Sequence, residues 1–321
     1  MNPDPRDAGS TLDALSRDPE FEGRLVFDAE IPERAALYGS LSTPLSPALT
    51  ERVAERKLDT LWSHQACAID ALRSKEHTVV ATGTASGKSL CYQLPILNSI
   101  INTSTSTSLL LFPTKALAQD QLRSMRSWLL PGVKAVTYDG DTPQEDRTWA
   151  RRNANVVLTN PEMLHMGILP SHARWATFLM RLDYVVVDEL HALRGIFGGH
   201  VSQVLRRLRR ICAHYGSSPT FCFTSATIGN PAELASTLIG SPVGAITDDG
   251  SPASAAVSEL ADDRFPRASS INGRCQSAKR LPLAGDPSSV MAPTGDPISV
   301  LASSAGLPIV ALVKQNVGED P

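Results

Sequence analysis

Short apolar runs separated by amphipathic stretches make up the middle of the chain. The runs lack the strict alternation of a half-exposed strand, which is typical of strands buried on both faces of a parallel sheet. Between them, apolar residues recur at helical spacing. This alternation predicts an α/β fold in which helices flank a parallel sheet. The predicted strands are residues 78–81, 109–112, 135–138, 156–159, 184–187 and 220–223.

The two ends of the chain differ in composition from the middle. Residues 1–50 are rich in proline, serine and acidic residues and predict an N-terminal extension with one short strand. From residue 47 to 73 the apolar spacing predicts two helices, at the start of a globular domain that we place at residues 51–250. Residues 251–321 contain one aromatic residue among many small residues and prolines, so we expect a low-complexity, disordered tail.

The segment VVATGTASGKS, residues 79–89, leads from a predicted strand into a loop of small residues. A nucleoside triphosphate requires inward-facing backbone N–H groups, an ammonium group for its β and γ phosphates, and a hydroxyl for the accompanying Mg²⁺. Lys88 and Ser89 supply the last two groups, so the loop predicts a site for ATP and Mg²⁺. Because Thr82 stands where the strict pattern has glycine, the alternative is a Gly/Ser-rich turn with a chance lysine. The predicted cofactor-binding residues of the loop are Thr82, Gly83, Thr84, Ala85, Ser86, Gly87, Lys88 and Ser89.

Two adjacent carboxylates end another apolar run. The sequence LDYVVVDELH, residues 182–191, predicts a buried strand that ends at Asp188 and Glu189. Carboxylates are costly at such a position unless they meet a metal ion or a reactant. We therefore expect Asp188 and Ser89 to hold Mg²⁺, and Glu189 to orient or deprotonate the attacking water as the catalytic residue. The alternative for an isolated Asp-Glu pair is a solvated turn.

Charge and cysteine content add little to this picture. The 321 residues carry a formal net charge of −3, so nucleic-acid binding would depend on local basic patches. The five cysteines include no C-x-x-C pair, so neither a disulfide framework nor a zinc site is indicated. No apolar segment reaches membrane-spanning length, and the N-terminus lacks the basic and apolar regions of a signal peptide. We expect a cytoplasmic protein without membrane association.

Several motifs, in order along the chain, resemble those of superfamily 2 helicases. TGTASGKS resembles motif I, with Ala85 where glycine is common, and DELH resembles the DExH form of motif II. Other segments resemble the adenine-reading glutamine (Gln65), motif Ia (PTKALAQDQ), motif Ib (TNPE) and motif III (SAT). The intervening sequence is most similar to the bacterial mitomycin repair factor A (YprA-like) group. The resemblance covers about residues 55–250 and corresponds to the first RecA-like domain of a DEAD/DEAH-box helicase.

The resemblance implies roles for these motifs. It implies that Gln65 reads the adenine of ATP, and that His191, Ser225, Ala226 and Thr227 couple the nucleotide state to nucleic-acid binding. It also implies a DNA partner, either single-stranded or a duplex with a single-stranded tail, with RNA as the alternative. Taken singly, the Thr-Lys and Thr-Asn pairs in these motifs are also ordinary helix caps. The implied nucleic-acid contacts are Pro113, Thr114, Lys115, Thr159, Asn160 and Pro161.

A denser basic cluster predicts structure rather than binding. Arg206, Arg207, Arg209 and Arg210 alternate with apolar residues, which favours an amphipathic helix whose arginines are solvated. We assign no DNA-binding role to this cluster.

The resemblance implies an ATP-dependent DNA helicase-type protein, with one part absent. A motor of this superfamily has two RecA-like domains, and the second supplies an arginine finger. Because residues 251–321 cannot hold such a domain, we expect a truncated protein that does not unwind a duplex alone. One alternative is a module that binds nucleotide and nucleic acid without turnover, and a second is a pseudo-enzyme that serves as an interaction scaffold.

Overall fold

The computed structural model describes residues 36–248 and 250, residue 17, and the short strands at residues 29–31, 252–253 and 313–315. It divides the chain into two compact units, one formed by residues 1–36 and 281–321 and the other by residues 37–280. In the first unit β1 (Ala29–Ile31) pairs in parallel with β12 (Val313–Gln315). Most of the predicted tail and the predicted N-terminal strand lie outside the described residues.

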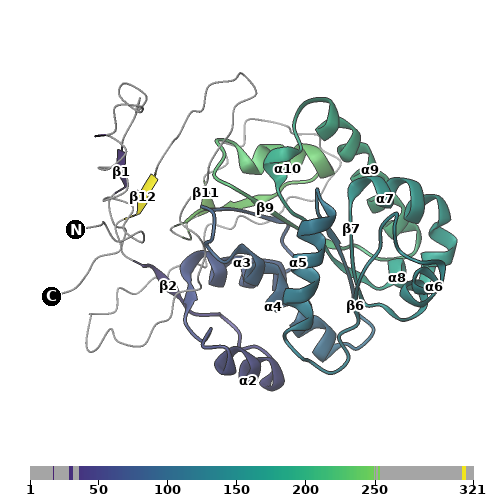
Figure 1. Cartoon of the computed structure of the whole chain (residues 1–321), viewed down its shortest axis with the longest axis horizontal. Helices are drawn as coiled ribbons and strands as arrows, with labels where there is room; N and C mark the ends of the chain where they lie inside the picture. The colour runs from purple at the N-terminus through teal and green to yellow at the C-terminus, as the bar shows by residue number, and fades with distance from the viewer. Residues whose placement is uncertain are drawn as a thin grey trace. The chain divides into compact units, whose positions relative to one another are not determined.

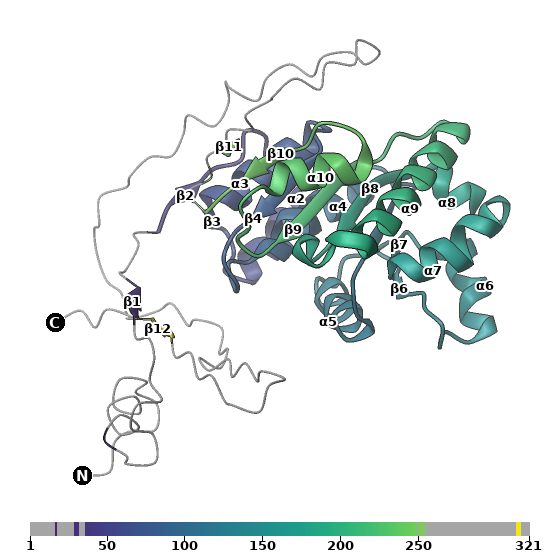
Figure 2. The ribbon, with the colours of Figure 1, turned by 90° about the horizontal axis from the view of Figure 1, so that it is seen from above.

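The second unit is built on one eight-stranded sheet (Figures 1 and 2). All neighbouring strands in it are parallel except β10 and β11, which form an antiparallel pair at one edge of the sheet. All six predicted strands are present, so the predicted parallel-sheet α/β fold is confirmed. In spatial order the strands are β11 (Pro252–Ala253), β10 (Gly244–Ile246), β4 (Thr78–Ala81), β9 (Thr220–Ser225), β8 (Leu182–Val187), β5 (Thr107–Leu111), β7 (Val156–Thr159) and β6 (Ala135–Thr137).

Helices cover both faces of this sheet (Figure 1). Alternate residues of one strand enter different cores: Leu110 packs with helices α2 to α5, whereas Leu109 and Leu111 pack with α8, α9 and α10. Burial on both faces explains why the strands read as continuous apolar runs. The helices are α2 (Pro47–Glu55), α3 (Ser63–Arg73), α4 (Lys88–Asn102), α5 (Lys115–Arg126), α6 (Gln144–Asn153), α7 (Pro161–Met163), α8 (Ala176–Met180), α9 (Gly195–His214) and α10 (Pro231–Ile239).

Shorter elements complete the domain. Helices α2 and α3 confirm the two helices predicted between residues 47 and 73, and a small antiparallel pair, β2 (Tyr38–Gly39) and β3 (Leu61–Trp62), precedes α3. The remaining turns of helix are η2 (Leu164–Ile168), η3 (Leu169–Trp175) and η4 (Leu190–Ala192). No helix in the described part of the chain combines the length and apolar character needed to cross a bilayer.

The predicted amphipathic helix over the arginine cluster is α9, but two of its arginines are not simply solvated. Arg206 Nη2 donates to the carbonyl of Thr237 at 2.7 Å, and Arg209 Nη1 donates to that of Ile239. These carbonyls belong to the last turn of α10, where backbone oxygens have no partner within the helix. The prediction was wrong for Arg206 and Arg209, because their guanidinium groups cap a neighbouring helix.

The described cysteines fall into two kinds. Cys91, Cys212 and Cys222 are buried free thiols, and burial raises the pKa of Cys212 to about 11. Cys67 is disulfide-bonded, which the cysteine spacing did not indicate.

Candidate functional site

The strand order brings three predicted motifs to the same edge of the sheet. Strand β9 lies between β4 and β8, with Ala81 opposite Ser225 and Val187 opposite Phe223. The loop after β4, the end of β9 and the carboxylates after β8 therefore emerge side by side. In open α/β sheets this carboxyl edge is where ligands bind.

The loop that follows β4 is closed on itself. Thr82 and Ser86 share a hydrogen bond of 2.6 Å between their hydroxyl groups, and Ser86 Oγ also donates to the Gly83 carbonyl at 2.9 Å. Lys88 Nζ donates to the carbonyls of Thr82 at 3.1 Å and Gly83 at 2.5 Å. The ammonium is thus held by two neutral oxygens, which the more strongly interacting oxygens of a phosphate can replace.

Two residues of the loop have left-handed backbone conformations. Gly87 has φ 70° and is the N-cap residue of α4, and Ala85 has φ 59°. A Cβ on Gly87 would lie 2.4 Å from Gln65 Nε2, so glycine is required there for space as well as conformation. The positive φ of Ala85 explains why glycine is the common residue at its position.

The carboxylates after β8 face the loop lysine. Asp188 is largely buried; this burial raises its pKa, and the hydrogen bond from Thr224 Oγ1 opposes the shift. Burial lowers the pKa of Lys88, and attraction from Glu189 and Asp188 opposes that shift. Opposite charges thus meet where the sheet ends, in partly buried surroundings that strengthen their interaction.

Glu189 lies in a strained turn. Its φ is 57°, in the left-handed region, where a residue with a side chain is held only by its surroundings. Glu189 Oε2 lies 3.1 Å from His191 Nδ1, and the two side chains remain 36% and 40% exposed. The pair is therefore open to solvent and to a ligand.

Gln65 and its neighbour His64, both on α3, contact the loop that follows β4. Gln65 Nε2 donates to the carbonyls of Ser86 at 3.4 Å and Gly87 at 3.3 Å, and His64 Nε2 lies 2.9 Å from the Ser86 carbonyl. Burial is the main cause of the lowered pKa of His64. These contacts connect Gln65 to the loop itself, and its role in reading adenine stays a prediction.

Sequence reasoning missed one residue of this site. Asp248 Oδ1 accepts a hydrogen bond from the Gly83 N–H at 3.1 Å, and its charge raises the pKa of both His64 and Lys88 against the larger effect of burial. Asp248 reaches the loop because β10 adds to the sheet beside β4. Strand β10 has only three residues, Gly244–Ile246, too short to stand out as an apolar run.

The implied nucleic-acid contacts lie further along the same edge. Thr114 Oγ1 caps α5 by accepting from Leu117 N at 3.3 Å, and Asn160 Oδ1 caps α7 by accepting from Met163 N at 2.7 Å. The exposed Lys115 forms an ion pair with Asp141, whose hydrogen bond raises the pKa of Lys115. Thr114 and Asn160 are thus helix caps, which is the alternative role that the sequence offered for them.

Other motif residues differ in how accessible they are. The buried Thr159 donates its hydroxyl to the Tyr138 carbonyl at 2.5 Å, and Pro161 is buried, whereas Pro113 is exposed. On β9, Ser225 Oγ is buried without a hydrogen-bond partner in the described part of the chain. Ala226 is half-buried and Thr227 is exposed.

The sheet order, the lysine loop and the carboxylates define a RecA-like fold with a phosphate-binding loop. A family model described as DEAD/DEAH box helicase matches residues 62–234, more than half of the chain. The chain therefore belongs to the DEAD/DEAH box helicase family.

Known relatives agree with this assignment. The chain is 46% identical over 226 residues to the uncharacterized ATP-dependent helicase YprA of Bacillus subtilis (strain 168), covering 70% of this chain and 30% of the relative. It is 42% identical to the ATP-dependent helicase hrq1 of Schizosaccharomyces pombe, covering 71% of this chain and 22% of the relative. Among solved structures, the DUF1998 helicase MrfA bound to DNA and AMPPNP matches with a TM-score of 0.67 and 44% identity, over 70% of this chain and 32% of that one. The chain thus spans a third or less of the length of these relatives, and its similarity to the mitomycin repair factor A group is confirmed.

Proposed function

We propose that residues 51–250 bind Mg²⁺ and ATP, hydrolyse ATP, and act as the first motor domain of a DNA helicase. The observation that carries the proposal is the adjacency of β4, β9 and β8, which brings Lys88 and the carboxylates Asp188 and Glu189 to one edge. Two relatives are named ATP-dependent helicases, and a solved relative is bound to DNA and AMPPNP. The proposal includes a cytoplasmic location, where ATP is available.

The donor set suits Mg²⁺. Carboxylate and hydroxyl oxygens are the protein ligands that this ion prefers, and Asp188 and Ser89 offer one of each. Asp188 is costly to ionise without a nearby cation because it is largely buried. The ion would supply charge neutralisation at the phosphates. Lys88 would exchange its contacts with the Thr82 and Gly83 carbonyls for phosphate oxygens.

Glu189 is the proposed catalytic residue. Its carboxylate is exposed and lies beside His191, so it can accept a proton from water while Asp188 stays with the metal. The unpartnered hydroxyl of Ser225, followed by Ala226 and Thr227, lies between the two carboxyl-edge loops and is available to respond to either. We assign His191 and these three residues to coupling between the nucleotide and nucleic-acid sites.

The nucleic-acid strand would cross the carboxyl ends of β5 and β7. Lys115 supplies a charge that can leave Asp141 for a phosphate, since both side chains are largely exposed. Pro113, Thr114 and Asn160 would contribute backbone and side-chain contacts at two helix N-termini, which favour phosphate groups. Thr159 and Pro161 are buried and would hold the backbone beside Asn160 in position.

Lys88→Ala tests the nucleotide part of this proposal. A charge-assisted contact contributes roughly 1.5 to 3 kcal/mol, so ATP should bind about ten- to a hundredfold more weakly. Lys134→Ala is the matched control, because that lysine is exposed and precedes β6, away from the loop. Isothermal titration with ATP and Mg²⁺ measures both. Equal affinity of Lys88→Ala and the unmodified chain would reject the site.

A further inference from the structure

A pocket of about 240 Å³ lies between α6 and the η2–η3 segment, apart from the motifs discussed so far. Its lining includes three arginines, Arg147 and Arg151 on α6 and Arg174 on η3, together with Tyr138 and Trp175. The two aromatic side chains are buried and meet edge to face, with ring centroids 5.0 Å apart. No aspartate or glutamate lines the pocket, so its net side-chain charge is positive.

The arginines keep unused hydrogen-bond donors. Arg174 is exposed and has no hydrogen bond or ion pair within the described residues. Arg151 donates only to neutral oxygens, the Tyr138 hydroxyl at 3.4 Å and Thr148 Oγ1 at 3.0 Å. Arg147 donates to the carbonyls of the turn after β6. Each guanidinium carries five N–H groups, so all three can still bind an anion.

Holding these charges together has a cost. Arg147 and Arg151 are four residues apart on α6, a spacing at which like charges destabilise a helix by about 0.2 to 0.5 kcal/mol. Arg174 faces the same pocket from another element, and none of the three forms an ion pair in the described part of the chain. An anion bound between these guanidinium groups would offset their repulsion. Phosphate suits this position, because its oxygens match the paired N–H groups of a guanidinium.

The position of the pocket indicates which anion. Tyr138 directly follows β6, and its carbonyl accepts the hydroxyl hydrogen of Thr159 in motif Ib. Strands β5, β7 and β6 are neighbours in the sheet, about 4.8 Å apart from one to the next. Lys115 follows β5, Asn160 follows β7 and Tyr138 follows β6, so the pocket comes next after Lys115 and Asn160 along this edge. A polyanion that crosses β5 and β7 would reach it next.

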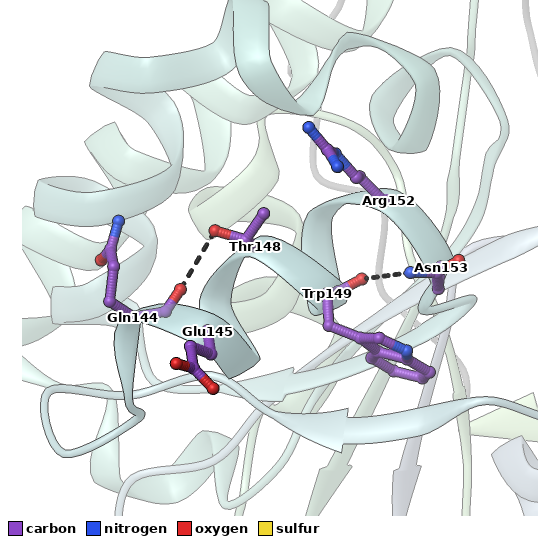
Figure 3. A pocket seen from close by; sticks show the side chains of 6 residues that line it. All are labelled: Gln144, Glu145, Thr148, Trp149, Arg152 and Asn153. Atoms are coloured by element: carbon purple, nitrogen blue, oxygen red, sulfur yellow. Dashed lines mark hydrogen bonds between the residues drawn. The ribbon is translucent and has the colours of Figure 1, made fainter.

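A second hollow on α6, of about 460 Å³, does not have this character (Figure 3). Its lining includes the carboxylate of Glu145 as well as the guanidinium of Arg152, so it lacks the excess of positive charge (Figure 3). The hydrogen bonds drawn in Figure 3, from Thr148 to the Gln144 carbonyl and from Asn153 to the Trp149 carbonyl, are internal to the helix.

We propose that Arg147, Arg151 and Arg174 form a binding site for a phosphodiester group of the nucleic-acid strand, one position beyond the motif Ib contacts. This inference rests on the proposed function, because it requires that a strand cross this edge of the sheet. It adds a contact that is independent of base identity, since phosphate contacts position a strand without reading its sequence.

Arg174→Ala is the cleanest test, because among the described residues this side chain forms no hydrogen bond or ion pair that its loss would break. An oligothymidylate labelled with fluorescein is titrated with the full chain at about 50 to 200 mM NaCl, and the logarithm of affinity is plotted against that of salt concentration. Each phosphate contact contributes about 0.7 to this slope for single strands, so Arg174→Ala should reduce the slope by about 0.7. Because the site binds one phosphate group, the double variant Arg151→Ala/Arg174→Ala should also reduce the slope by about 0.7 and should bind more weakly than the single variant. Affinity for the single variant should fall about two- to fivefold.

Arg210→Ala is the matched control, because it removes one exposed arginine from α9. It should leave the slope unchanged, and ATP affinity should be unchanged in all these variants. If the unmodified chain binds DNA and Arg174→Ala has the same slope, the phosphate site is rejected while the proposed function stands. If the unmodified chain binds neither ATP nor DNA, the proposed function is rejected and this inference with it.

Discussion

The strained backbone of Ala85 leads to an unusual expectation, that a substitution in the phosphate loop stabilises the protein. Ala85 has φ 59°, and the left-handed conformation costs a residue with a Cβ roughly 1 to 2 kcal/mol. Ala85→Gly removes this cost but adds freedom to the unfolded chain, worth about 0.4 to 1 kcal/mol. Because the alanine side chain is exposed, little packing is lost. The net result should be a gain of about 0.5 to 1 kcal/mol in the free energy of unfolding.

Gly87→Ala provides the opposite case in the same loop. Gly87 has φ 70°, and an added Cβ would lie 2.4 Å from Gln65 Nε2. The Gln65 amide can move away only by giving up its hydrogen bonds to the Ser86 and Gly87 carbonyls. Conformational strain and these lost bonds together should lower the free energy of unfolding by about 2 to 3 kcal/mol.

Urea denaturation measures both effects on the same scale, from the midpoint and slope of the transition. For a domain of this size, 1 kcal/mol corresponds to a shift of about 2 to 4 °C in Tm, so thermal melting is an independent check. An Ala85→Gly protein that is less stable than the unmodified chain would refute the reasoning, because it would mean that Ala85 is not strained. A Gly87→Ala protein of unchanged stability would show that the loop and Gln65 are not packed as described.

Three further predictions concern individual side chains. Glu189→Gln should leave ATP affinity nearly unchanged and abolish hydrolysis by any two-domain relative built around this domain; loss of binding instead would assign Glu189 a structural role. Thr224→Val removes the hydroxyl that stabilises ionised Asp188, so the pKa of Asp188 should rise further. When the pH is lowered, Mg²⁺-dependent ATP binding should therefore be lost at a higher pH in the variant than in the unmodified chain; the same pH dependence in both would contradict this. Burial, with a smaller contribution from Arg209, lowers the pKa of His77 to about 4, so the stability that neutral His77 provides is lost as pH falls from 6.5 towards 4. His77→Asn keeps an acceptor for the Phe221 N–H and should reduce that acid-induced loss by roughly 2 to 3 kcal/mol in urea titrations at pH 7 and 4.5; equal losses would rule the explanation out.

The parts of the fold that sequence predicted are those in which one local pattern determines the outcome. Strands such as Val156–Thr159 are buried on both faces, and burial of this kind leaves a continuous apolar run that can be read without neighbours. The positions of Lys88 and Asp188 follow directly from such runs, because each comes after the strand that carries it. For this reason the sequence predicts that the lysine loop and the paired carboxylates each follow a strand, and the structure has both strands at those positions.

What sequence missed depends on which segments become neighbours. Asp248 enters the site only because three-residue β10 pairs with β4, and Arg206 and Arg209 are occupied only because α10 ends beside α9. The arginine pocket at Arg174 likewise joins α6 to a segment some twenty residues further on. Amphipathic spacing shows which face of a helix is polar, but it carries no information about the backbone groups opposite that face.

The arrangement of the sheet also limits how the proposed coupling can work. Asp188 N donates to the Leu111 carbonyl and Phe112 N donates to the Thr159 carbonyl, so the proposed nucleotide and nucleic-acid sites lie on strands joined by backbone hydrogen bonds. A packed sheet positions both sites, but it has no second arrangement to switch into. Coupling requires an element with two arrangements, which places it in the loops after the strands. The turn at Glu189 is the best suited of these, because its strained φ of 57° is maintained by contacts, including the one to His191, that a bound nucleotide would change.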